Sequence, residues 1–67
     1  MKNLRLKAAR AGKDYSQQQL ADLCGVSRQT INAIEKGRFV PSTVLALKIA
    51  RYFNKKVDDI FVLDDED

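Results

Sequence analysis

Residues 16–37 carry the apolar and polar pattern of two short helices joined by a tight turn. Ser16 is a candidate N-cap of the first helix, and Gln19 three residues later completes a capping-box pattern. The small and apolar positions, expected to bury one face, are Leu20, Ala21, Leu23 and Cys24. Gly25 follows at the point where a positive φ costs least, so we expect the helix to end there.

The second helix of this pair is predicted from Arg28 to Lys36, with Ser27 as its N-cap. The positions expected to point inward are Ile31, Ile34 and the small Ala33. The polar side chains gather in the first turn and a half: Arg28, Gln29, Thr30 and Asn32. Side chains of these types hydrogen-bond to the base edges and phosphates of DNA. The pattern therefore predicts a helix-turn-helix whose second helix reads DNA.

Three more helices are expected on either side of the pair. Residues 4–11 form the first, with Leu6 and Ala9 facing inward. Ser42 caps another over residues 43–53, and residues 57–60 form a last helical turn. The buried stripe of the 43–53 helix follows the i, i+3, i+4, i+7 spacing at Ala46, Ile49, Ala50 and Phe53. We therefore predict an all-α fold of five helices in a single domain over residues 1–67.

The two ends of the chain leave a small sheet open as an addition to these helices. Residues 2–6 alternate polar and apolar side chains, and residues 60–63 are a β-prone apolar run. They can pair as a two-stranded antiparallel ribbon, although so short a ribbon needs packing support.

Composition excludes several classes of function. The 67 residues include one cysteine and no histidine, so we expect neither a disulfide nor a zinc or other metal site. Cys24 lies on a predicted buried face, which favours an inert core thiol over a redox sensor. The chain lacks a phosphate-binding glycine loop and the length to enclose a pocket, so we expect no enzyme and no cofactor. No membrane-spanning run or signal-peptide pattern is present, and a cytoplasmic protein is expected.

The net charge of +3 conceals a strong asymmetry. Residues 1–57 hold all 12 Lys and Arg residues and three acids, whereas residues 58–67 hold six acids and no base. The two parts therefore carry charges of +9 and −6. A basic body suits a polyanion such as double-stranded DNA. The acidic tail at residues 64–67 either stays away from DNA or serves solubility alone.

The motif SQQQLADLCGVSRQTINAIEKGRFVPS resembles the Xre/Cro/CI type of helix-turn-helix regulator. The later segment LALKIARYFNKKVDDIF resembles the fourth and fifth helices of the same family. Overall length, the SRQTI segment and the trailing apolar run resemble its compact subgroup, which includes a cytolysin repressor. The resemblance implies a lambda-repressor-like domain, and in the subgroup a small sheet from the termini. It also implies a transcription factor, usually a repressor, that binds a two-fold operator as a homodimer.

The resemblance implies roles for residues at matching positions. Arg28 and Gln29 match positions that reach base edges, where Arg–guanine and Gln–adenine pairs each contribute roughly 1–3 kcal/mol of discrimination. Asn32 lies one turn further along the same face and is expected to read a base as well, with a phosphate as the alternative. The positions expected to contact the DNA backbone are Gln17, Ser27, Thr30, Lys36 and Arg38. For Ser27 and Thr30 the thymine methyl is the alternative, and Gln17 is also expected to brace the second helix of the pair. Arg10 and Glu35 match a structural pair that joins the first helix to the end of the third.

Self-association is expected through apolar side chains on the outer side of the 43–53 helix and in the C-terminal run: Val44, Leu47, Phe61, Val62 and Leu63. An exposed apolar strand on so small a monomer is otherwise hard to explain. A different class of function also stays open. Xre-like folds act as antitoxins or as anti-repressors that bind another protein, alone or in addition to DNA.

Overall fold

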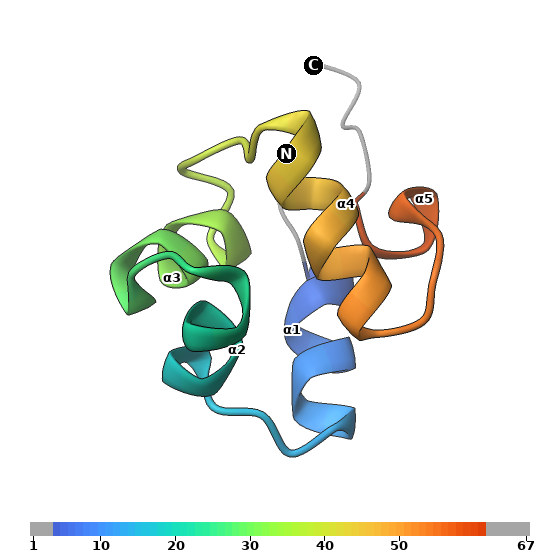
Figure 1. Cartoon of the computed structure of the whole chain (residues 1–67), viewed down its shortest axis with the longest axis horizontal. Helices are drawn as coiled ribbons and strands as arrows, with labels where there is room; N and C mark the ends of the chain where they lie inside the picture. Colours follow the sequence, from blue (N-terminus) through green and yellow to red (C-terminus); the bar gives the residue numbers. More distant parts are fainter. Residues whose placement is uncertain (1–3, 62–67) are drawn as a thin grey trace.

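The computed structural model describes residues 4–61 of the 67-residue chain, and within that range it is built from helices alone (Figure 1). The elements in chain order are α1 (Leu4–Gly12), α2 (Gln17–Cys24), α3 (Arg28–Glu35), α4 (Thr43–Tyr52) and α5 (Val57–Ile60). All five predicted helices are present, with ends within one residue of those expected. The all-α prediction is therefore confirmed.

Serine side chains determine where the central helices begin. In α2, α3 and α4 the N-cap Oγ accepts a hydrogen bond from the backbone N–H three residues later, at 3.0–3.2 Å; the three caps are Ser16, Ser27 and Ser42. In α2 the Gln19 side chain also accepts from the Ser16 N–H at 2.7 Å, which completes the predicted capping box. Each such cap stabilises a helix by about 1 kcal/mol.

The core lies where α1, α4 and α5 meet the α2–α3 pair. Its largest fully buried side chains come from all five helices: Leu6, Leu20, Ile31, Ile34, Ile49 and Ile60. Phe53, at the end of α4, packs against Tyr15 with ring centroids 6.1 Å apart. Burial of Ile31 and Ile34 in this core fixes the position of α3 against the other helices.

One expected core position is wrong. Leu20, Ala21 and Cys24 are buried, but Leu23 is 41% exposed. At about 100° per residue, Leu23 lies roughly 100° from the centre of the stripe formed by the other three positions, so it falls at the edge of the buried face.

The predicted terminal ribbon is tested only in part. Leu4–Leu6 belong to α1, where Leu6 is fully buried, so this part of the chain is helical and not extended. Phe61 has an extended backbone, with φ −104° and ψ 127°. The ribbon positions at residues 2–3 and 62–63, and the acidic tail at 64–67, lie outside the described residues.

Candidate nucleic-acid interface

The α2–α3 pair has the geometry of a helix-turn-helix (Figure 1). Gly25 ends α2 with φ 72° and ψ 31°, a left-handed conformation that glycine adopts without a Cβ penalty. The Val26 N–H then donates to the Ala21 carbonyl at 3.0 Å, which closes the helix end. Val26 packs against the core, and Ser27 begins the next helix. The predicted turn is therefore present at the predicted residues.

The two sides of α3 differ sharply in their exposure. Ile31, Ile34 and Glu35 are buried against the other helices. Arg28 and Gln29, at the start of α3, are exposed. Among residues 4–61, neither of these two side chains has a hydrogen-bond or ion-pair partner. Both are therefore available to a ligand in front of α3.

The hydroxyl groups of Ser27 and Thr30 lie together beside them. Ser27 Oγ is 3.0 Å from Thr30 Oγ1 and also accepts from the Thr30 N–H at 3.2 Å. The cap of α3 is thus held by a local pair of hydroxyls. One hydroxyl donates its proton to the other, so the second keeps a proton that it can donate to a phosphate oxygen.

A polar network joins α1, α2 and α3 behind the exposed face. Asn32 Nδ2 donates to Gln17 Oε1 at 3.3 Å, and Gln17 Nε2 donates to Glu35 Oε1 at 3.1 Å. Arg10 Nε donates to Glu35 Oε2 at 2.7 Å, and Arg10 Nη1 donates to the Tyr15 carbonyl at 2.8 Å. Glu35 is only 7% exposed, and a buried carboxylate needs such partners.

The network brings together four residues that the sequence assigned to different roles. Arg10 and Glu35 form an ion pair between α1 and the end of α3. Gln17 and Asn32 lie between that pair and the exposed start of α3, with their amide groups bonded to each other. Through this bond Gln17 braces α3, as the resemblance implies, whereas the choice of Asn32 as its partner depends on how α2 crosses α3.

Two cations follow the end of α3. Lys36 is its C-cap, and Gly37, with φ 75°, turns the chain toward Arg38, whose N–H donates to the Ala33 carbonyl at 2.8 Å. The side chains of Lys36 and Arg38 are both exposed. Positive charge therefore lies beyond the C-terminal end of the helix that carries Arg28 and Gln29.

Two further features concern side chains around α2. The Tyr52 hydroxyl donates to the Leu23 carbonyl at 2.8 Å and ties α4 to the end of α2, a contact that no sequence pattern indicated.

Cys24 is buried, and desolvation raises the pKa of its thiol while the charge of Lys48 opposes that rise. A raised pKa keeps the thiol protonated and unreactive.

The predicted self-association residues are exposed where the structure describes them. Val44 is 63% and Leu47 is 56% exposed on the outer side of α4. Leu47 and the half-buried Phe61 line a groove of about 300 Å³ together with Val40 and Pro41. Val62 and Leu63 lie outside the described residues. Within residues 4–61, none of the helices could span a lipid bilayer.

Comparison with known proteins gives consistent matches over nearly the full chain. A family model described as helix-turn-helix (HTH_3) matches residues 6–60. The uncharacterized HTH-type transcriptional regulator YgzD of Bacillus subtilis is 52% identical over 66 residues, which cover 98% of each chain. An uncharacterized HTH-type transcriptional regulator of Methanocaldococcus jannaschii is 52% identical over 67 residues, which cover 100% of both.

Solved structures give the same result. The restriction-modification controller protein C.AhdI from Aeromonas hydrophila aligns with a TM-score of 0.78 and 33% identity over 87% of this chain and 84% of its own. The clp gene regulator ClgR from C. glutamicum aligns with a TM-score of 0.74 and 27% identity over 84% and 73% of the two chains.

Proposed function

Because the chain belongs to the HTH_3 family of helix-turn-helix, DNA-binding transcriptional regulators, we propose that it is a repressor that binds a two-fold operator as a homodimer. One observation carries the proposal. Arg28 and Gln29 project from the start of α3, and neither side chain has a hydrogen-bond or ion-pair partner among residues 4–61. Folding therefore needs neither of them. Side chains of this kind at this place on a second helix are suited to reading base edges.

In the proposed complex α3 lies in the major groove. Arg28 and Gln29 read bases. Asn32 also reads a base, once its side-chain amide has given up its hydrogen bond to Gln17 and formed one with the base edge. Gln17 and the Ser27–Thr30 hydroxyl pair, through its one remaining proton, contact phosphates near the start of α3. These contacts place the helix in register but carry no sequence information.

Lys36 and Arg38 complete the proposed contacts with the DNA backbone. Both are exposed, and both follow the C-terminal end of α3, away from the base-reading side chains. Each neutralised phosphate releases counterions, so these residues should govern the salt dependence of binding more than its sequence preference.

Dimerisation follows from the size of the reading helix. One α3 covers only a few base pairs, and two such helices about 34 Å apart reach successive major grooves on one side of the duplex. The exposed Val44 and Leu47, with the neighbouring groove at Phe61, give the second subunit an apolar surface. Relatives come from bacteria and archaea, whose DNA lies in the cytoplasm, and the proposal includes that location.

The test begins with selection of bound sequences from a random duplex library, followed by footprinting. A two-fold site and a repressed reporter placed behind it are the expected results. Sedimentation at tens of micromolar should show a dimer that Leu47→Glu dissociates. Ala11→Glu makes the same charge change at an exposed position of α1 and should leave the dimer intact.

Two outcomes contradict the proposal. A monomer that stays a monomer when the selected duplex is added rules out the dimeric complex. Failure to select any sequence, together with a stable protein partner in a pull-down from the native host, favours an antitoxin-like or anti-repressor function.

A further inference from the structure

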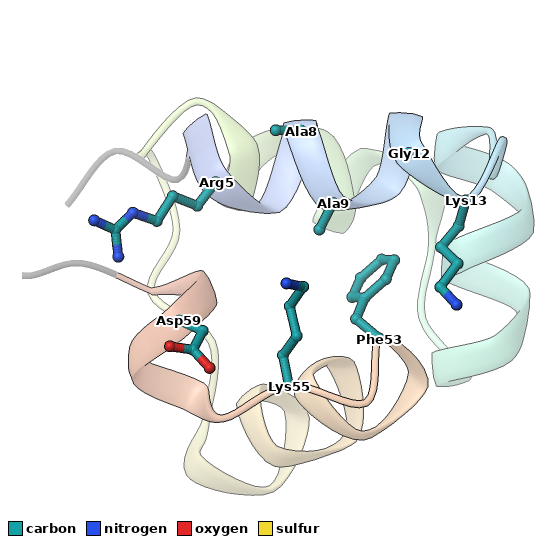
Figure 2. Close-up of a pocket in the computed structure, with 8 residues that line it drawn as sticks. All are labelled: Arg5, Ala8, Ala9, Gly12, Lys13, Phe53, Lys55 and Asp59. Atoms are coloured by element: carbon teal, nitrogen blue, oxygen red, sulfur yellow. The ribbon is translucent and has the colours of Figure 1, made fainter.

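A groove with a volume of about 480 Å³ runs between α1 on one side and the α4–α5 connection and α5 on the other (Figure 2). Its inner wall is formed by small residues of α1, including Ala9 and Gly12, and by the ring of Phe53. The helix α3 does not contribute to it. The proposed contact with DNA therefore leaves this groove unused.

Three cationic side chains are spread along the groove. Figure 2 shows Arg5 toward one end, Lys13 toward the other, and the Lys55 amine pointing into the space between them. All three are exposed, and within residues 4–61 none takes part in an ion pair or a side-chain hydrogen bond. Asp59 is the only acid among the described lining residues, and its carboxylate accepts from the Lys56 N–H at 3.2 Å.

The chain itself carries a matching anion. Residues 64–67 are Asp-Asp-Glu-Asp and follow Phe61 by only three positions. An extended chain covers about 3.4 Å per residue, so residue 64 can lie about 10 Å from Phe61. Asp59, two residues before Phe61, already lines the groove. The distance from Asp59 is therefore short enough for the tail to reach the groove.

The spacing of charges also fits. From Arg5 to Gly12 the helix α1 rises about 10 Å, and three extended steps from residue 64 to residue 67 cover about the same length. We propose that the acidic tail of the same chain binds along this groove, with its carboxylates beside Arg5, Lys55 and Lys13. Each of the three cations then gains a partner that the described residues do not supply.

The consequence for DNA binding rests on the proposed function. The four acids of residues 64–67 give the tail a charge of −4, which would repel a duplex if the tail reached α3. A tail held between α1 and α5 is kept away from α3, so the exposed cations Arg28, Lys36 and Arg38 meet DNA without competition. The groove would thus bind the tail and keep its negative charge away from the DNA-binding surface.

The first test is an NMR comparison of the full chain with a neutral-tail variant, Asp64→Asn/Asp65→Asn/Glu66→Gln/Asp67→Asn. We expect shifts of the side-chain ammonium signals of Lys13 and Lys55 and of the Gly12 amide. Lys7 and Lys48, which are exposed but do not line the groove, serve as controls and should not shift. Unchanged groove signals, equal shifts at the controls, or shifts that depend on protein concentration overturn the proposal.

The second test measures affinity for a random duplex. Lys13→Gln/Lys55→Gln and the control Lys7→Gln/Lys48→Gln remove the same charge, each with the natural and with the neutral tail. With the natural tail, the groove variant should bind DNA several-fold more weakly than its control. With the neutral tail, the two should bind alike. If the groove variant still binds DNA more weakly than its control when the tail is neutral, the tail is not bound in this groove. If no form of the protein binds DNA, the proposed function is contradicted instead.

Discussion

Arg10 on α1 is bonded to both carboxylate oxygens of Glu35 on α3: Nε donates to Oε2 at 2.7 Å, and Nη2 donates to Oε1 at 3.4 Å. The side chains of Arg10 and Glu35 are 16% and 5% exposed, so the pair is largely withdrawn from water. Oε1 also accepts from Gln17 Nε2 at 3.1 Å. One carboxylate therefore joins three helices and sets the position of α3.

We expect removal of one member of the pair to lower the free energy of unfolding more than removal of both, because the remaining side chain is left without its partner. Arg10→Met leaves a buried carboxylate without its cation, and the free energy of unfolding should fall by about 2–3 kcal/mol; Arg10 is 16% exposed, so this is less than for a fully buried pair. The double variant Arg10→Met/Glu35→Gln should lose less than the sum of the two single changes. Urea denaturation of all four forms measures the coupling.

A control contact is available on the exposed side of α2. Gln18 Nε2 donates to Asp22 Oδ1 at 2.8 Å in an exposed i, i+4 contact, and its removal should cost only a few tenths of a kcal/mol. If Glu35→Gln and the double variant both unfold close to the natural chain, the ion pair contributes no measurable stability.

The helices could be predicted from the sequence because their ends depend on local chemistry. A serine cap, a capping box and a left-handed glycine each act within a few residues, and Ser16, Gln19 and Gly25 were placed correctly. Leu23 was misplaced because its exposure depends on how α2 is rotated against α4. Tyr52, whose hydroxyl reaches the Leu23 carbonyl, gave no signal in the sequence for the same reason.

The candidate site divides in the same way. The exposure of Arg28 and Gln29 follows from the apolar spacing of α3 itself, so periodicity was sufficient. The bond between Asn32 and Gln17 joins residues 15 positions apart on two helices and depends on their crossing. The basic groove between α1 and α5 depends on tertiary packing as well, and no local pattern indicated it.

Two glycines provide a test of backbone conformation alone. A Cβ added at Gly12 or at Gly25 would meet no atom within 4 Å, but only Gly25 has a positive φ, of 72°. Gly25→Ala should therefore destabilise the protein by about 1–2 kcal/mol, whereas Gly12→Ala should leave its stability unchanged or raised by up to about 1 kcal/mol. Thermal unfolding of both variants measures the difference. Equal melting temperatures would show that the turn between α2 and α3 does not need glycine.

The raised pKa of Cys24 predicts a pH dependence of stability. Burial makes the folded pKa of this thiol higher than the unfolded pKa, despite the opposing charge of Lys48. The unfolded state therefore loses its proton first, and the contribution of Cys24 to stability should be complete below the unfolded thiol pKa and should fall as the pH rises through the folded one. Urea denaturation of the natural chain and Cys24→Ala across this range isolates the thiol. A difference between them that stays constant with pH contradicts the prediction.

The last prediction distinguishes base reading from backbone contact. Arg28→Ala or Gln29→Ala should weaken operator binding by roughly 1–3 kcal/mol and relax the preference at particular base pairs. Both side chains are exposed and make no contact that folding needs, so unfolding curves should match the natural chain. Affinity for the operator and for a random duplex, measured at several salt concentrations, provides the comparison.

Lys36→Ala and Arg38→Ala serve as the contrast, because these cations lie beyond the end of α3 and are expected to meet phosphates alone. Either change should weaken binding to operator and random duplex equally. Each should also flatten the slope of log K against log salt by about one unit per lost contact. If Arg28→Ala behaves in this way too, Arg28 is a phosphate contact. Base reading would then rest on Gln29 and on Asn32, which would have to release Gln17 in order to reach a base.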